Sequence, residues 1–526
     1  MKNVSQAWKE NQNKTLVNES FVEISLDITD PDVRKDANPK DNGSIYISQT
    51  NQIVSEVNKN IVPYSTLEQN LWLLDNSRKI IPVDNYGDCG FIGNVLSGDN
   101  LSFTIPPVIT INFTQVHPNV IPAITITWGT AYNEFATNFI IKVYNGNSVL
   151  TEKEITNNTD VKSIVTMDIS NFDKITIQIL KWCLPNRRAR IEDIFIGLNK
   201  VYTKRDLFSY KHTQSIDPVS TALSKDEITF SIDNSDNFYN PYNKDGLAKY
   251  LMERQEVVTR YGYKLNDGSI EWIQGGTFYL SEWDATQSGR TADFKARDIL
   301  EYLSQVYYDG EYNASGVSLY NLALRLFEYS DLPLNKDGSL KWHLDESLKT
   351  IYSTAPLPVD TIANNLQMIA HAGCCVIYQD RSGIIHIEPI NNQSTDYAIT
   401  LKNSYSKSNI RLVKPLKELI VYHYDYSTDE PTQSEIKLTH ETTGDVVVVD
   451  NPLITSSERA YIVGNWMKDY LKSRTYIESS WRADPRLDAL DIVTNTNEFI
   501  SNKVRMTEIN YSYNGAFKGT GEGRVI

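Results

Sequence analysis

Residues 228–242 read Ile-Thr-Phe-Ser-Ile-Asp-Asn-Ser-Asp-Asn-Phe-Tyr-Asn-Pro-Tyr, and this stretch decides the fold of the segment around it. Ile228, Phe230 and Ile232 alternate with polar residues, which is the period-2 pattern of a strand with one buried face. The polar run 233–236 predicts a turn, because short polar side chains bond to their own backbone. The next loop carries aromatic side chains that we expect to pack against the protein: Phe238, Tyr239 and Tyr242.

Two further strands and a helix follow this loop. The segments 276–283 and 291–296 predict a hairpin that turns at residues 287–290. Asp298 occupies the position of a helix cap, and apolar residues at helical spacing follow in 299–303. The region contains no nucleophile–base pair and no metal-ligand pattern, so we interpret it as a rigid structural block.

Several segments resemble tail proteins of bacteriophages and prophages, in which they belong to the baseplate hub. They are Phe-Ser-Ile-Asp-Asn-Ser-Asp-Asn-Phe-Tyr-Asn-Pro at 230–241, Gly-Thr-Phe-Tyr-Leu at 276–280, Ala-Arg-Asp-Ile-Leu at 296–300, Tyr-Ser-Thr-Ala-Pro-Leu-Pro at 352–358, Ala-His-Ala-Gly-Cys-Cys-Val-Ile-Tyr-Gln-Asp at 370–380, Arg-Ala-Asp-Pro-Arg-Leu at 482–487 and Tyr-Asn-Gly-Ala-Phe-Lys-Gly-Thr-Gly-Glu-Gly-Arg at 513–524.

The resemblance implies a structural component of the virion tail, made in the host bacterial cytoplasm, that joins tail tube to tip. It also implies a homotrimer with two related β-barrels per chain, whose partners are other tail proteins: distal tail, tape-measure and fibre proteins. A receptor- or polysaccharide-binding tail protein is the alternative that the resemblance leaves open.

Composition agrees with a globular, β-rich protein. The chain has 526 residues, of which 40% are hydrophobic and 22% charged, and it contains 31 tyrosines. A net charge of −15 argues against specific nucleic-acid binding, because phosphate contacts need clustered Lys and Arg. An acidic wall that DNA passes without sticking and ordinary acidic solubility both explain this charge.

The pattern of cysteines and histidines predicts no metal site, no cofactor and no disulfide framework. The four cysteines form no CxxC pair, and the seven histidines are scattered, so a residue such as His371 is expected to be structural. We expect no signal peptide and no membrane span, because no apolar run approaches ~18 residues.

We expect a mainly β fold with an α+β portion, arranged in five parts. Residues 1–84 form an N-terminal β arm that pairs with the first hub barrel, and 85–198 form an inserted jelly roll. Residues 199–310 form the first hub β-barrel, 311–392 a helix-plus-hairpin domain, and 393–526 a second hub β-barrel with the C-terminal region.

Helical spacing predicts three helices in the second half of the chain. The first spans 317–329, the second spans 360–372, and a hairpin formed by 375–379 and 384–388 follows. The third helix spans 456–473. Ile462, Trp466, Tyr470 and Leu471 are predicted to share one side of this helix.

Residues 85–198 contain alternating strands at short spacing and no helix, which is typical of a β-sandwich. The closing segment 187–197 resembles the last strand of galactose-binding-like jelly rolls, so this part is similar to a carbohydrate-binding module. The interpretation as a spacer stays open, because Trp128 alternates with isoleucines as a core residue would. The candidates for contact with a host cell-surface glycan are Trp128, Tyr132, Trp182, Arg187 and Arg188.

Catalysis is the third class of function considered. Paired carboxylates cleave glycosidic bonds, and Glu282 with Asp284 beside Trp283 is the best available pair. No sequence feature marks a cleft there, so we expect that the chain is not an enzyme.

Overall fold

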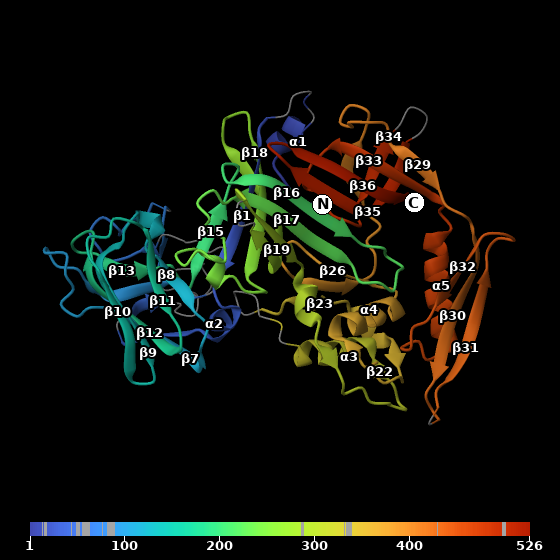
Figure 1. Cartoon of the computed structure of the whole chain (residues 1–526), viewed down its shortest axis with the longest axis horizontal. Helices are drawn as coiled ribbons and strands as arrows, with labels where there is room; N and C mark the ends of the chain where they lie inside the picture. Colours follow the sequence, from blue (N-terminus) through green and yellow to red (C-terminus); the bar gives the residue numbers. More distant parts are fainter. Residues whose placement is uncertain are drawn as a thin grey trace.

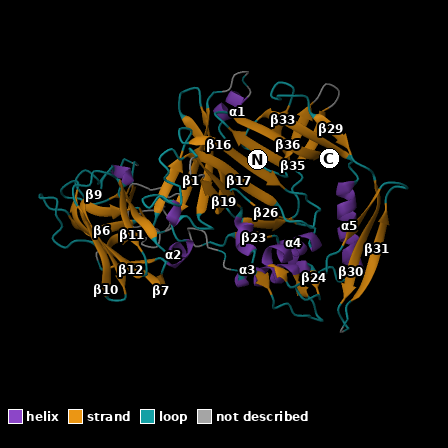
Figure 2. Ribbon diagram, in the orientation of Figure 1, coloured by secondary structure: helices purple, strands orange, loops and turns teal. Residues whose placement is uncertain are grey.

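The computed structural model describes residues 1–12, 14, 18–43, 45–48, 53–54, 64–75, 77–80, 90–285, 289–330, 332, 339–428, 430–496 and 501–526. A long β-sheet occupies the centre of the molecule, and a β-sandwich forms one end (Figure 1). Helices gather below the central sheet and beside a small sheet at the other end (Figure 2). The predicted fold class, mainly β with an α+β portion, is confirmed.

The central sheet joins strands from both halves of the chain. Its strands, in spatial order, are β15 (Leu198–Tyr202), β1 (Ser20–Ile28), β18 (Glu256–Lys264), β19 (Ile270–Ala285), β20 (Thr291–Arg297), β17 (Lys225–Asp233), β16 (Leu207–Ser215), β35 (Ser501–Tyr513), β36 (Phe517–Val525), β33 (Thr475–Arg482) and β29 (Asn409–Leu412), with β34 (Ile492–Thr496) pairing β35 and β28 (Ser394–Ile399) pairing β34. β1 lies between β15 and β18, so the N-terminal strand pairs with much later strands.

The prediction of two separate β-barrels is wrong for the described residues. The strand order from β15 to β29 is an open path, in which no barrel closes. The reason is that β16, at the edge of the first set of strands, pairs antiparallel with β35 of the second set from Tyr210↔Tyr513 to Ser215↔Glu508. The backbone groups along the edges of β16 and β35 are therefore hydrogen-bonded by the other half of the chain, and neither half closes on itself.

The alternating residues 228–232 lie in β17, which is a core strand, as the alternation predicts. Phe230 is buried and lies directly opposite Phe294 of β20, with ring centroids 5.0 Å apart and stacked. Tyr239 from the following loop contacts Phe294 edge-on at 5.2 Å. The expectation that all three aromatic side chains of the loop pack is wrong for Phe238 and Tyr242, which are 36% and 85% exposed.

The sandwich contains two main sheets around a shared core. One is β10 (Ser148–Ile155), β9 (Ala136–Asn145), β12 (Phe172–Trp182), β7 (Val108–His117) and β2 (Asn38–Asp41); the other is β11 (Lys162–Ile169), β8 (Ile121–Thr127) and β14 (Asp193–Phe195). Smaller pairings are β13 (Arg188–Ile191), β6 (Phe91–Leu96) and β3 (Ile45–Ser48), and β4 (Tyr64–Ser65) with β5 (Lys79–Ile80). Helix α2 (Pro31–Asp36) packs near β7.

Two strands within residues 1–84, the predicted N-terminal arm, pair with strands of this sandwich. β2 pairs with β7, and β3 pairs with β6. Pro39 is compatible with β2, because β2 is an edge strand. A proline has no amide hydrogen to donate, and an edge strand needs no donor on the side that no other strand pairs. The jelly-roll assignment of the sandwich stays a prediction, as do the domain boundaries.

The α+β part contains the two helices predicted for it, α3 (Leu319–Tyr329) and α4 (Ile362–Ala372). The predicted hairpin is also present as β26 (Val376–Gln379) and β27 (Ile385–Glu388), and β23 (Trp342–Leu344) adds in parallel. Short pairs are β21 (Val306–Tyr307) with β25 (Asp360–Thr361) and β22 (Val317–Ser318) with β24 (Tyr352–Ser353). The buried face of α3 is the predicted one: Leu319, Leu322, Ala323, Leu326 and Phe327.

Short helices complete the described elements. They are α1 (Gln6–Gln12), η2 (Thr130–Tyr132), η3 (Ala248–Tyr250), η4 (Ile299–Leu303) and η5 (Glu346–Thr350). Asp298 caps η4, as predicted, by accepting a hydrogen bond from the Leu300 amide. The predicted helix there is a single short 3₁₀ segment.

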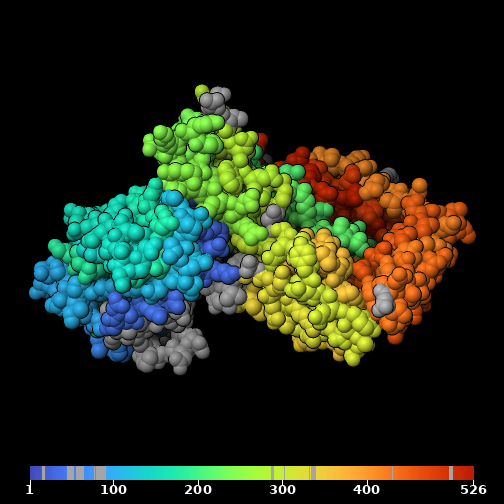
Figure 3. Space-filling model, turned by 60° about the horizontal axis from the view of Figure 1, so that its bottom comes forward, coloured from blue at the N-terminus to red at the C-terminus, as the bar shows by residue number. Residues whose placement is uncertain are grey.

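A small sheet with one helix forms the end of the molecule opposite the sandwich (Figure 1). In the space-filling view its atoms, in orange, lie at the far end from those of the sandwich (Figure 3). The sheet is β31 (Thr432–Thr439), β30 (Leu416–Asp425) and β32 (Asp445–Val449), and helix α5 (Ser457–Leu471) packs on β30 and β31. Of the four residues predicted to share one side of α5, Trp466, Tyr470 and Leu471 pack against the core and Ile462 is exposed. The buried residues of α5 are Ala460, Val463, Gly464 and Met467. Small side chains face the sheet because the helix approaches it closely at Gly464, beside Leu438.

Replacing Phe230 with alanine should lower the free energy of unfolding by about 3–5 kcal/mol, because it leaves a cavity beside Phe294. Urea unfolding followed by circular dichroism measures this change. Tyr242→Ala is the matched control, and it should change the free energy by less than about 0.5 kcal/mol because the side chain is exposed. Equal effects of the two substitutions would contradict the assigned strand faces.

His371 on α4 should make stability depend on pH. Burial lowers its pKa to about 4, so the folded protein binds this proton less readily than the unfolded chain does. Its contribution is therefore present above the unfolded pKa of about 6.5 and is lost as pH falls toward 4.

Between pH 7 and 4.5 the wild-type protein should lose about 2 kcal/mol more stability than His371→Leu, because the variant has no proton to bind there. Urea unfolding of both proteins across this pH range tests the difference. Parallel pH profiles would show that His371 is not the titrating group.

Candidate functional site

The five residues predicted to contact a glycan lie at one end of the sandwich. Trp128 and Trp182 are fully buried, and their rings meet edge-on at 6.0 Å. The indole nitrogen of Trp128 donates to Ser163 at 2.8 Å, and that of Trp182 donates to Glu134 at 3.0 Å. Neither ring presents a face on which a sugar stacks, so the core interpretation of Trp128 holds and extends to Trp182.

The arginines of this cluster are held by internal acceptors. The Arg187 Nε donates to Glu134 at 2.9 Å, and the Arg188 guanidinium donates to the carbonyl of Gly93 at 3.2 Å. Arg190, at the end of the same arginine-rich segment 187–190, makes a buried ion pair with Glu68. Glu134 and Glu68, and not solvent, are therefore the acceptors for Arg187 and Arg190.

Tyr132 completes the cluster. Its hydroxyl donates to the Tyr64 carbonyl at 2.9 Å, and its ring lies under the Arg190 guanidinium at 4.9 Å. Burial raises the pKa of Tyr132, with Arg190 acting in the opposite direction. The structure therefore brings all five residues together, as a mutually satisfied network, and glycan binding by them stays a prediction.

The carboxylates considered for catalysis lie on an exposed strand face. Glu282 is exposed and forms ion pairs with Lys295 at 3.4 Å and Arg297 at 3.2 Å. Asp284 is also exposed and lies opposite Asp293 in the register of β19 and β20. Residues 282 and 284 share one face, as expected, but line neither of the two cavities described among the resolved parts of the chain.

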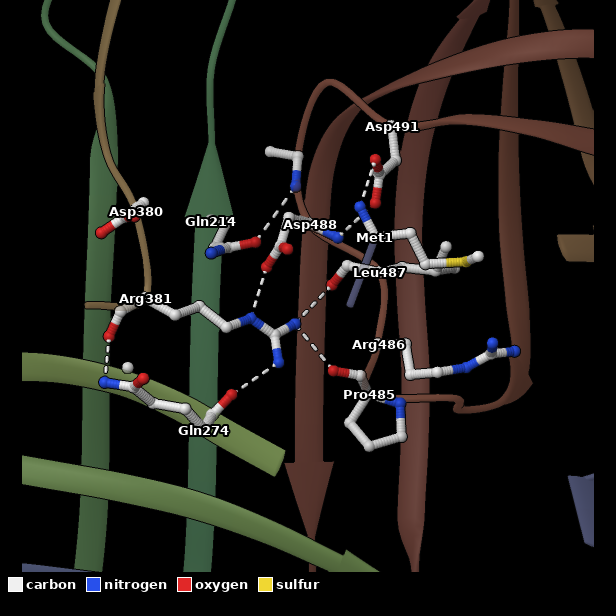
Figure 4. Close-up of polar contacts among 12 residues, drawn as sticks. Met1, Gln214, Gln274, Asp380, Arg381, Pro485, Arg486, Leu487, Asp488 and Asp491 are labelled. Carbon is white, nitrogen blue, oxygen red and sulfur yellow. Dashed lines mark hydrogen bonds and ion pairs between the residues drawn. The ribbon is translucent and has the colours of Figure 1, made fainter. Parts of the chain in front are cut away.

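A second site, which the sequence analysis does not predict, is a polar junction centred on Arg381 in the turn of the β26–β27 hairpin. Figure 4 shows its guanidinium reaching two other parts of the fold. Nε donates to Asp488 at 2.7 Å, and Nη1 donates to the Gln274 carbonyl of β19 at 2.9 Å. Nη2 donates to two carbonyls of the loop before β34, those of Pro485 at 2.7 Å and Leu487 at 3.0 Å.

This side chain is buried and its bonds fix the protonation state. Burial alone would lower the pKa of Arg381, but Asp488 raises it above the usual value, so the guanidinium stays charged. In return, the Gln274 amide donates to the Arg381 carbonyl at 2.8 Å. One residue thus ties the α+β part to both halves of the central sheet.

A cavity of about 280 Å³ adjoins this junction. Its walls come from the start of the chain, β16, the β26–β27 hairpin and the loop 488–491. Burial raises the pKa of Asp491, although the Met1 amino group, 2.8 Å away, acts in the opposite direction. Polar and charged groups lining the cavity are largely paired with one another, as expected of a structural seam.

The sequence contained partial signals for this junction. The turn 380–383 was predicted from its glycine, and 482–487 was singled out by resemblance. Nothing in either segment specified that they meet, because an arginine in a hairpin turn is ordinarily exposed.

The described part of the chain contains neither a metal-ligand cluster nor a helix suited to cross a membrane. No group of three or more His, Cys, Asp or Glu side chains there is arranged to hold a metal ion. No described helix combines the length and the apolar character that crossing a membrane requires.

Comparison with known proteins finds similarity in structure and not in sequence. No family model and no curated protein matches the sequence. The 43 kDa tail protein of prophage MuSo2 from Shewanella oneidensis is 14% identical with a TM-score of 0.43, and the match covers 62% of this chain and 95% of that protein. A tail protein from Neisseria meningitidis MC58 is 10% identical with a TM-score of 0.42, covering 62% and 93% respectively.

Prophage tail protein gp18 from Listeria monocytogenes EGD-e is 11% identical with a TM-score of 0.41, covering 62% of this chain and 91% of that protein. The structural neighbours are therefore phage and prophage tail and baseplate proteins.

Replacing Arg381 with methionine should lower the free energy of unfolding by about 3–5 kcal/mol, because Asp488 and three carbonyls lose their partner. Arg381→Lys should lower the free energy of unfolding by less, about 1–3 kcal/mol, since lysine keeps the positive charge but lacks the planar guanidinium that reaches several acceptors at once. Urea unfolding measures both values. Exposed Arg205→Met is the control, and a loss for Arg381→Met no larger than the control's would refute the junction's role.

Proposed function

We propose that this protein is a structural hub of a phage tail or tail-like particle, which joins the tail tube to the tip and to host-attachment proteins. The observation that carries the proposal is the continuous central sheet, in which β16–β35 pairing joins the two halves of the chain. Backbone hydrogen bonds across this seam resist shear, which is what a part between tube and tip requires. The resemblance of the quoted sequence segments supports the same role.

The Arg381 junction adds to this rigidity. It fixes the helical part against the sheet through a charged side chain with four hydrogen bonds. The sandwich lies at the opposite end from α5, so it extends away from the seam (Figure 1). In the proposed particle the sandwich contacts other tail proteins or the host surface.

We further propose that the chain acts as a homotrimer in the virion tail and catalyses no reaction. A closed ring repeats each interface, so modest contacts suffice for assembly. The central sheet then forms the wall around the tail axis, and the net charge of −15 keeps passing DNA from adhering.

Native mass spectrometry of the purified full chain tests the assembly. The expected species has a mass of about 180 kDa, three times the 59.9 kDa of one chain. Negative-stain electron microscopy of the same sample should show closed rings.

A strictly monomeric chain that releases reducing ends from cell-wall glycan would overturn the proposal. That activity should then disappear in Glu282→Gln/Asp284→Asn, the carboxylate pair considered above. A monomer without activity would refute the trimer alone.

A further inference from the structure

The end of the molecule opposite the sandwich carries several open strand edges, and two of them have exposed apolar side chains. Among the described strands, β29 pairs with β33 alone and β32 pairs with β30 alone. Each therefore presents one edge whose backbone groups no other strand pairs. Both lie at the same end of the molecule in Figure 1.

These edges are apolar to an unusual degree. On β32, Val446 is 47% and Val448 is 53% exposed, while Val447 and Val449 pack toward the core. On β29, Ile410 and Leu412 are more than half exposed. Two more apolar side chains before β29 are also exposed: Leu401 and Tyr405.

β32 lacks the features that protect edge strands. The other edge of the same small sheet, β31, carries Glu435 and Lys437 on its exposed face, and such charges discourage pairing with another chain. β32 reads Asp-Val-Val-Val-Val, with no lysine, proline or bulge-forming glycine within it. Its composition favours strand addition, in which another strand extends the sheet.

The charges around the two edges are opposite in sign. The segment 401–414 around β29 contains Lys402, Lys407, Arg411 and Lys414 and no carboxylate. The segment 416–450, which forms the small sheet, contains eight carboxylates and two lysines. Within one chain an exposed ion pair, Lys414–Asp445 at 3.5 Å, joins the two segments.

We propose that β32 and the segment 401–414 form one self-association surface, in which the basic β29 edge of one copy docks on the acidic β32 edge of a second copy. A basic partner would fit the small sheet only, and an acidic partner would fit the β29 edge only. A second copy satisfies both charges and both apolar edges with the same contact.

The inference deepens the proposed function, because it specifies which surfaces the self-assembly uses. The opposite charges align the approaching copies, and the valines and Ile410 supply the apolar area that excludes water.

The first test is sedimentation velocity of the full chain carrying Val446→Thr and Val448→Thr. Threonine keeps the β-branched shape and strand propensity but buries two hydroxyls at the contact, so self-association should weaken by about tenfold or more. The control is Val149→Thr/Leu150→Thr on β10, which are also about half exposed but lie on the sandwich, and it should sediment as wild type.

The second test exchanges charges between the surfaces. Lys402→Glu/Lys407→Glu alone and Glu441→Lys/Asp445→Lys alone should each be monomeric, because like charges then face each other. Mixing the two variants should restore association as mixed oligomers in native mass spectrometry. Circular dichroism of each variant confirms that it is folded.

The outcomes separate the two proposals. An oligomer that survives both sets of substitutions unchanged refutes this surface and leaves the proposed hub intact. A wild-type chain that is monomeric at micromolar concentration refutes self-association altogether, and binding of β32 to another tail protein alone then becomes the explanation of its exposed valines. Restored association on mixing the charge variants is the result expected from a second copy.

Discussion

The antiparallel pairing of β16 with β35 joins two sets of strands that are separated by almost 300 residues. Each strand would otherwise be a bare edge, so pairing satisfies backbone groups on both sides at once. The pairing also explains why neither half closes into a barrel, since the edge needed for closure is already occupied. The positions of the other parts follow from it: the sandwich extends from the β15 and β1 side, while the small sheet follows β29.

Arg381 has a related role at the level of side chains. Its guanidinium links a hairpin turn to β19 and to the loop before β34, so three segments distant in sequence share one buried charge. A buried cation without such partners would be costly, and the loops must adopt one arrangement to provide them. The sandwich uses the same principle, because Glu68 and Glu134 neutralise Arg190 and Arg187 at its end.

Local periodicity was sufficient to predict much of the secondary structure. The alternation in 228–232 gave the core strand β17, and the apolar spacing in 319–327 gave the buried face of α3. It was incomplete for α5, where Trp466, Tyr470 and Leu471 pack against the core as one side, but Ile462 lies toward solvent and Gly464 lies against the sheet. The positions of large apolar residues could not identify the face of α5 that contacts the sheet, because a helix that lies close to a sheet needs small residues at the contact.

The sequence by itself determined the fold class, the strand and helix content, and the absence of an obvious catalytic motif, because these depend on near neighbours along the chain. It also suggested the tail-protein resemblance through short segments. Only the tertiary structure decided which strand edges meet, that Trp128 and Trp182 are core residues, and that Arg381 is a junction. Those outcomes depend on contacts between residues far apart in sequence, and no local pattern encodes the partner of an edge strand or of a charged side chain.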